Sequence, residues 1–286
     1  MKKGLFIVFL IMSATCFGQE ELESILNNET PESSIKVSAT FKGTRILNGH
    51  SVETRKKSNF EFLISHRFGR INSGADELFG LDDSNIRFGF EYALTDNLSI
   101  AIGRSSFEKT YDTYVKYKLI DQKKGKKSFP FSLTYLGSIT EKTLKDYDPN
   151  NKPTFVNRLT YTNQLLIAKK FSPSFSFQIS PTYIHFNTVR TTEDDNNIYA
   201  IGFGSRMKLS KRISLNAEYF YNTNQFKSRD INNSLALGID IETGGHVFQL
   251  IFSNSRSMIE KGFITETTGN FFKGDIHFGF NISRAF

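Results

Sequence analysis

Apolar and polar residues alternate with a period of two along about twelve segments of this chain. In residues 86–94 every second residue is apolar, starting at Ile86, and the residues between them include Arg87 and Glu91. A period of two places the two sets on opposite faces of a β-strand. The alternation therefore predicts an all-β protein whose strands each have one apolar face and one polar face.

The charged residues in mid-strand fall on the polar face, and a dry protein core could hold so many only with dense pairing. The opposite face carries Phe, Tyr, Leu or Ile on nearly every strand, which is more apolar surface than one soluble core requires. A soluble β-sandwich or periplasmic barrel would show the same period. These two features instead favour an antiparallel up-and-down transmembrane β-barrel with its charged face toward the lumen. The charged residues predicted to face the lumen are Arg67, Arg87, Glu91, Lys116, Arg158, Glu218 and Asp240.

A closed sheet is also the structure that the rest of the chain permits in a membrane. No stretch of about 20 apolar residues is present to form a spanning helix, and open sheet edges do not survive in hydrocarbon. Short connections such as 210–212 alternate with long ones such as 255–272, as expected for periplasmic turns and outer loops. The connection 107–110 is short on the side expected to be long. Pro181 interrupts a predicted strand, where a bulge would accommodate it.

The N-terminus has the pattern of a secretory signal peptide. Lys2 and Lys3 precede an apolar run over residues 5–12, which is too short to span a bilayer, and small residues follow. We expect cleavage after Gly18. A lipid anchor on Cys16, the only cysteine, is the alternative, although the residues before it match a lipobox poorly. The predicted regions are the signal peptide 1–18, an N-terminal segment 19–57 and the barrel 58–286.

The N-terminal segment is not predicted to belong to the barrel wall. Residues 19–34 are acidic and polar, and residues 43–57 have turn chemistry without a sustained period. This segment is expected to lie in the periplasm or inside the lumen. Twelve strands ~4.8 Å apart and tilted by ~40° leave a lumen of on the order of 12 Å between side chains. We therefore expect a narrow or plugged lumen rather than a wide pore.

The last strand resembles the closing strand and assembly signal of bacterial outer-membrane β-barrels, because it is apolar on one face and ends on an aromatic residue. Arg284 departs from that pattern, since an apolar residue is commoner there. The resemblance implies an outer-membrane location, with outer-membrane lipid and the barrel-assembly machinery as partners. The residues that would form the assembly signal are Phe278, Phe280, Ile282 and Phe286.

Four further stretches carry a family resemblance that covers most of the mature chain. They are residues 41–43, 65–69, 79–82 and 103–112, and the last of them reads Gly-Arg-Ser-Ser-Phe-Glu-Lys-Thr-Tyr-Asp. The chain is similar in these stretches to an exported β-barrel family of Bacteroidetes-type bacteria, domain of unknown function 5777. The resemblance implies an outer-membrane barrel and carries no established activity.

Catalysis and metal binding have weak support in the sequence. His50 and Ser51, with Glu53, supply the residue types of a hydrolase, but adjacent residues on an extended chain point to opposite faces. The remaining histidines fall on different predicted strands without metal-ligand spacing. Acidic pairs in the loops, around 146–148 and 194–195, could hold a cation but are more often solvated. We predict no enzyme, no catalytic residues, no metal and no cofactor.

The stretch from residue 104 to residue 111 is the candidate functional hairpin, because it is tight and combines charges with aromatic rings. One interpretation is a hairpin that grips a ligand or closes the lumen. The favoured interpretation is a well-packed turn with internal ion pairs. The residues concerned are Arg104, Glu108, Lys109 and Tyr111.

Three functions are compatible with these patterns. A narrow channel or transporter for small solutes ranks first, a structural barrel that docks a periplasmic or surface protein ranks second, and a lipid-active enzyme ranks third. Removal of Lys2 and Lys3 with the signal peptide lowers the formal charge from +7 to +5. This mild excess fits a surface that faces lipid headgroups and does not suggest nucleic acid as a partner.

Overall fold

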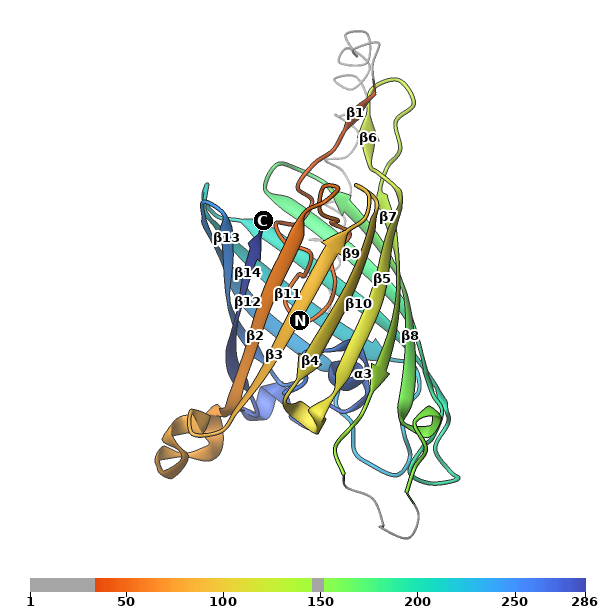
Figure 1. The fold of residues 1–286 in the computed structure, drawn as a ribbon. Helices are drawn as coiled ribbons and strands as arrows, with labels where there is room; N and C mark the ends of the chain where they lie inside the picture. The colour runs from red at the N-terminus through yellow and green to blue at the C-terminus, as the bar shows by residue number, and fades with distance from the viewer. Residues whose placement is uncertain (1–33, 146–151) are drawn as a thin grey trace, which may run out of the picture.

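The computed structural model describes residues 34–145 and 152–286. The predicted signal peptide and the acidic pair near residue 147 lie outside the described residues. Twelve strands form one closed antiparallel barrel, in which each strand pairs with the barrel strands before and after it in the chain (Figure 1). This architecture confirms the predicted fold class and the predicted number of strands.

The barrel strands are β2 (Phe60–Arg70), β3 (Ser84–Ala93), β4 (Leu98–Ser105), β5 (Tyr111–Ile120), β7 (Ser132–Glu141), β8 (Leu159–Lys170), β9 (Phe175–Phe186), β10 (Asn197–Lys208), β11 (Ile213–Asn222), β12 (Ser234–Thr243), β13 (His246–Ser253) and β14 (His277–Ala285). Two short strands, β1 (Ile35–Lys36) and β6 (Lys123–Lys124), pair with each other outside the barrel. The helical turns are η1 (Ile71–Ser73), η2 (Ala75–Gly80), η3 (Phe107–Lys109), η4 (Val156–Arg158), α3 (Glu260–Thr265) and η5 (Phe271–Lys273).

Burial alternates along the strands as the sequence pattern predicts. In β3 the apolar Phe88, Phe90 and Tyr92 are exposed on the outer face, whereas Arg87 and Glu91 are buried inside. Outward aromatic rings of neighbouring strands stack on each other, with Phe62 and Phe88 at 6.1 Å between centroids. The outer face is therefore a continuous apolar surface, which suits hydrocarbon and not water.

The barrel closes where the two ends of its wall meet. Strand β14 pairs with β2, and Phe286 extends the ladder because its N–H donates to the carbonyl oxygen of Phe60 at 2.8 Å. A register shift occurs between His277 and Gly279. A side chain at Gly279 would collide with the carbonyl oxygen of His66, so glycine permits this irregularity.

Pro181 does not produce the bulge that was expected. It lies opposite Ile201 in β10, and the β8–β9 pairing keeps one register from Gln164 with Thr182 to Ile167 with Ile179. The expectation was wrong because a proline removes one donor from the ladder but does not require an inserted residue.

The two ends of the barrel differ in their connections. Chain turns such as 94–97 and 209–212 are short at the end that carries Phe286 and β1, whereas loops such as 223–233 and 254–276 are long at the opposite end (Figure 1). Outer-membrane barrels have short turns on the periplasmic side. We therefore call the first end periplasmic and the second end outer.

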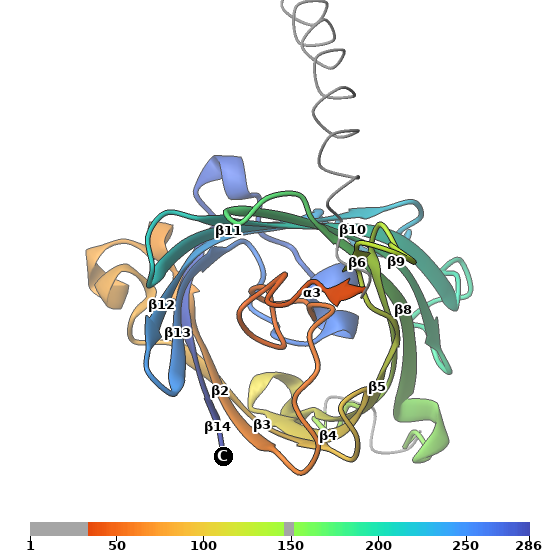
Figure 2. The ribbon, with the colours of Figure 1, turned by 90° about the horizontal axis from the view of Figure 1, so that it is seen from above.

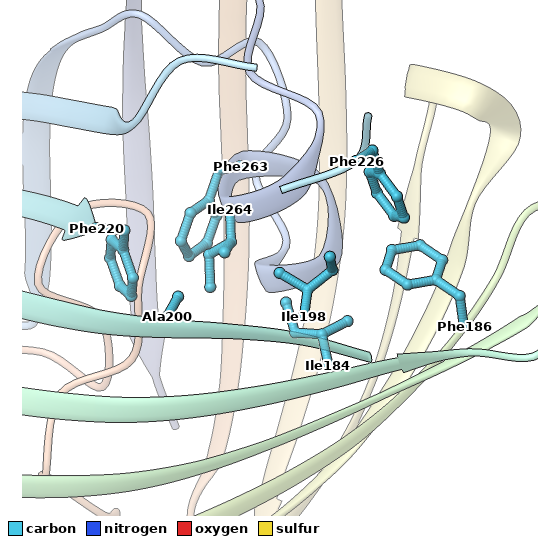
Figure 3. Packing of buried hydrophobic residues seen from close by; sticks show 8 residues of the cluster. All are labelled: Ile184, Phe186, Ile198, Ala200, Phe220, Phe226, Phe263 and Ile264. Carbon is cyan, nitrogen blue, oxygen red and sulfur yellow. The ribbon is translucent and has the colours of Figure 1, made fainter. Parts of the chain in front are cut away.

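The longest outer loop folds back into the barrel mouth. Its helix α3 packs Phe263 and Ile264 against buried apolar residues on the inner wall of β9, β10 and β11 (Figure 3). Among these, Ile198 and Phe220 lie on the parity that is elsewhere polar. None of the helices within the two described ranges is long and apolar enough to cross a bilayer.

The orientation of the apolar face makes a testable prediction. Ile239 lies in the middle of β12 and points outward between Leu215 and Leu250. We expect Ile239→Lys to lower the free energy of unfolding by about 2–4 kcal/mol, because the ammonium group would enter hydrocarbon. Chemical denaturation in lipid vesicles, followed by circular dichroism, measures this change. The control Ile239→Leu should stay within about 0.5 kcal/mol, and equal stabilities for the two variants would contradict the orientation.

Candidate functional site

Residues 40–55 enter the lumen from the periplasmic end and fill it, and we call them the plug (Figure 2). Every residue from Thr40 to Val52 is buried except Lys42. The plug forms a tight hairpin, in which Ile46 N–H donates to the carbonyl oxygen of Gly49 at 2.9 Å. The turn chemistry of the sequence therefore serves a lumenal hairpin and not a surface loop.

Glu218 of β11 holds the tip of the plug. Its carboxylate accepts the backbone N–H groups of Leu47 at 3.1 Å, Asn48 at 2.8 Å and Gly49 at 3.1 Å. Successive N–H groups that converge in this way form an anion-binding nest. A buried carboxylate without partners would be costly, and the nest supplies the partners of Glu218.

Side chains of the barrel wall also satisfy the carbonyl groups of the plug. They come from strands around the whole barrel, and each donates to a different backbone oxygen, which a buried peptide group requires. Lys116 Nζ makes two such bonds, at 3.1 Å to Thr44 and 2.6 Å to Glu53. The other bonds join Gln249 to Ile46 at 2.7 Å, Asn281 to Leu47 at 2.8 Å, Gln178 to His50 at 2.8 Å and Thr134 to Val52 at 3.0 Å.

Two inward-facing glycines leave room for the apolar side chains of the plug. A Cβ atom at Gly204 would collide with Ile46, and a Cβ atom at Gly238 would collide with Leu47. Ile46 also packs in a buried cluster with Leu166 of β8. The inner wall is thus complementary to the plug in shape as well as in hydrogen bonding.

The predicted lumen-facing charges lie in this interior with the exception of Arg158. Each has a hydrogen-bond partner, and for Arg87 that partner carries the opposite charge. Besides Lys116 and Glu218, the pairs are Arg67 with Asn48 at 2.7 Å, Arg87 with Asp112 at 2.5 Å, Glu91 with Tyr114 at 2.8 Å and Asp240 with Gln249 at 2.8 Å.

Arg158 is placed differently from the prediction. It belongs to the helical turn η4 at the outer mouth and pairs with Glu141 at 2.9 Å. The prediction that Arg158 lies in mid-strand was wrong, because β8 begins one residue later, at Leu159. The alternation of polar and apolar residues continues from the strand into the preceding turn, so the period alone does not show where the strand begins.

Helix α3 contacts the plug from the outer side. Glu260 accepts a hydrogen bond from Arg45 at 3.1 Å, with both side chains buried. His50 Nε2 lies 3.6 Å from the same carboxylate, too far for a hydrogen bond, and its ring packs edge-on against Tyr114. Sequence reasoning missed Glu260, although the inward apolar residues Ile198 and Phe220 were a signal that a loop covers them.

The hydrolase-type residues are close in sequence but are not arranged as a triad. Ser51 Oγ donates to the carbonyl oxygen of Gly43 at 2.6 Å, and Glu53 accepts the N–H of Thr40 at 2.7 Å. Within the described part of the chain, no hydrogen bond joins His50 to Ser51. Likewise, no cluster of potential metal ligands occurs among the residues that the structure describes.

The candidate hairpin forms the turn η3 and its flanks. The Arg104 guanidinium lies 4.7 Å from the centre of the Tyr111 ring. Glu108 pairs with Lys261 of α3 at 2.8 Å and with Lys142 at 2.9 Å, and the carbonyl oxygen of Lys109 accepts the Thr143 hydroxyl. The ion pairs of the turn are therefore not internal, because both partners of Glu108 lie outside residues 104–111. Through Glu108 the turn is joined to the loop that carries α3.

Fold and site together define a membrane β-barrel whose lumen is occupied by its own N-terminal segment. The chain belongs to the family described as membrane bound beta barrel domain (DUF5777), whose profile matches residues 41–286. The match begins inside the plug, so plug and wall are matched together. The protein is accordingly a β-barrel of the bacterial outer membrane.

Solved structures with a similar chain trace include two porins and an outer-membrane channel. A NanC porin has 8% identity and a TM-score of 0.49, and the match covers 78% of this chain and 98% of the porin. A KdgM porin has 8% identity and a TM-score of 0.49, with coverage of 79% and 99%. An outer-membrane channel from Pseudomonas putida F1 has 13% identity and a TM-score of 0.48, with coverage of 82% and 97%. No curated protein matches the chain.

The nest around Glu218 predicts a local effect on the plug. We expect Glu218→Gln to speed amide hydrogen exchange at Leu47, Asn48 and Gly49 by about tenfold, because three charge-assisted bonds lose the anion. Exchange measured by mass spectrometry tests this. Glu141→Gln is the control, since its partner Arg158 lies at the outer mouth. Equal exchange in the two variants would mean that the carboxylate does not hold the plug.

We call the ion pairs of Glu108 with Lys261 and Lys142 the outer latch. They predict that the packing of the outer loops around Glu108 depends on pH. Burial alone would raise the pKa of Glu108, but Lys261 and Lys142 lower it from 4.5 to about 2. A depressed folded-state pKa means that the stabilisation is present above pH 4.5 and is lost as the pH falls toward 2. Since the chain has no Trp, Phe107→Trp provides a single fluorescent reporter. Its signal should change between about pH 4.5 and 2, and adding Glu108→Gln should reduce that change; identical titrations would contradict the latch.

Proposed function

We propose that the protein is a gated outer-membrane channel for small solutes, with the plug as its gate. The observation that carries this proposal is the type of bond that holds the plug. Side chains make all the hydrogen bonds between the plug and the barrel strands, and in the described ranges no backbone–backbone bond joins residues 40–55 to the wall. The plug is therefore a separate piece that can leave without opening a β-ladder.

The energetics of release support a gate. A net hydrogen bond is worth about 0.5–1.5 kcal/mol, because water replaces the lost partner. The wall groups that bind the plug, such as Gln249 and Asn281, are polar and can be hydrated once it leaves. The twelve strands keep their backbone pairing throughout. An emptied lumen, on the order of 12 Å wide between side chains, would admit small hydrated solutes.

Single-channel recording in planar bilayers tests the gate. We expect the intact protein to be closed most of the time, because the plug fills the lumen. Deletion of residues 34–57 should produce a steady open conductance. Heat-modifiable electrophoretic mobility and circular dichroism would verify that the deletion variant is a folded barrel. A folded deletion variant that conducts no ions would overturn the channel proposal.

A disulfide lock supplies the matched control. A Cβ atom at Gly204 would lie 3.7 Å from Ile46 Cγ1, so the two side chains face each other and the double variant Ile46→Cys, Gly204→Cys is designed to link plug and wall by a disulfide. The predicted mature chain has no other cysteine. The oxidised variant should remain closed, and reduction should restore the openings of the intact protein. Openings at equal frequency in both states would show that the plug is not the gate.

A second candidate is docking of a periplasmic protein, and one observation favours it. The β1–β6 ribbon projects beyond the barrel at the periplasmic end (Figure 1), and β1 leads directly into the plug. Two contacts fasten the β1 segment to the β6 segment. They are a hydrogen bond from Val37 N–H to the carbonyl oxygen of Gln122 at 2.8 Å and the Lys36–Asp121 ion pair at 2.7 Å. Cross-linking from position 124 in whole cells tests this role, and recovery of the protein alone would count against it. Neither candidate assigns a catalytic step to His50 or Ser51.

A further inference from the structure

A cavity lies at the outer mouth, apart from the plug. Its volume is about 570 Å³, which is in the range of small-ligand sites. The loops after β7, β9 and β11 surround it together with α3. Its described lining includes five basic and two acidic side chains, so its net charge is +3. These residues are Lys142, Arg158, Arg190, Arg229, Lys261, Glu108 and Glu266.

The acidic side chains of the cavity are already engaged. Glu108 pairs with Lys142 and Lys261, and Glu266 also pairs with Lys261. Arg158 pairs with Glu141 outside the cavity lining. The excess positive charge therefore resides on the two remaining arginines, Arg190 and Arg229, which form no ion pair with the described carboxylates.

Arg229 is held in place but forms no ion pair with the carboxylates that the structure describes. Its guanidinium stacks on the Phe226 ring at 4.3 Å, and its buried Nε finds no acceptor among the described residues. Burial lowers the pKa of Arg229, Glu266 opposes that effect, and the charge of Arg190 reinforces it. Asp194 and Glu108 also oppose that effect at longer range. A bound anion would add a direct partner for the two guanidinium groups, which form no ion pair with these carboxylates.

The cavity also has an apolar side. Phe226 and Phe186 meet edge to face at 5.1 Å, and Val189 and Leu144 complete this part of the lining. A fully hydrated inorganic ion would leave these groups without a contact. The combination of the stacked Arg229 guanidinium and the Arg190 charge with aromatic and aliphatic walls is complementary to an anion that carries an apolar group.

We propose that this cavity is a binding site for a small water-soluble organic anion, with its carboxylate or phosphate on Arg190 and Arg229 and its apolar group against Phe226 and Val189. The site lies on the outer side of α3, whose Glu260 holds the plug. The proposal does not require the channel function, because binding can be measured on the closed protein.

Calorimetric titration of the full-length protein in detergent tests the site with phenyl phosphate as the probe. We expect saturable binding that weakens as salt is added. Arg229→Gln and Arg190→Gln should each weaken binding by about tenfold or more. Lys211→Gln, in a periplasmic turn, is the charge-matched control and should bind as the unchanged protein does. Absent binding, or equal loss in the control, would overturn the proposal.

Two further measurements define the class of ligand. Phe226→Ala should weaken phenyl phosphate more than inorganic phosphate, because only the former has an apolar group to lose; an equal effect would overturn the organic part of the assignment. The titration is then repeated in nanodiscs with and without lipopolysaccharide. Equal affinity in the two preparations supports a soluble ligand, whereas competition by lipopolysaccharide would assign the cavity to lipid phosphate instead.

Discussion

Pairing of backbone N–H and C=O groups is the constraint on which this structure depends. Hydrocarbon offers no hydrogen-bond partner, so the wall must pair every strand with two neighbours and close on itself. The bonds between Phe60 and Phe286 complete that closure at the periplasmic rim. The outward aromatic residues then cover a wall that has no free edge, and the apolar face can be continuous.

The same constraint operates inside the barrel with a different solution. The plug has few backbone bonds of its own, so its peptide groups need partners from the wall. Glu218 accepts hydrogen bonds from three N–H groups of the plug, and the side chains of Gln249 and Asn281 donate to its carbonyl oxygens. Polar residues on the lumenal parity thus act as specific ligands of the plug. This division leaves the wall independent of the plug, and the proposed gating depends on that independence.

Predictions from the sequence succeeded where the signal was local. Alternation identified the strands and their faces, since neighbouring side chains of a strand always point to opposite sides. It was less reliable at strand ends, where Arg158 continues the polar parity although it belongs to a turn. The bulge expected at Pro181 was wrong for a related reason, because only the partner strand shows whether a residue is inserted.

The residue pattern alone therefore predicted a barrel and its two faces, and the resemblance of the last strand implied the outer membrane. The tertiary structure alone decided what fills the lumen. Glu218 is 170 residues from Asn48, and Glu260 is 215 residues from Arg45. No period connects such positions, because their contact depends on the closure of the wall and on the path of a hairpin through it. Alternation records the environment of each strand face, and it contains no information about which distant side chain will meet it.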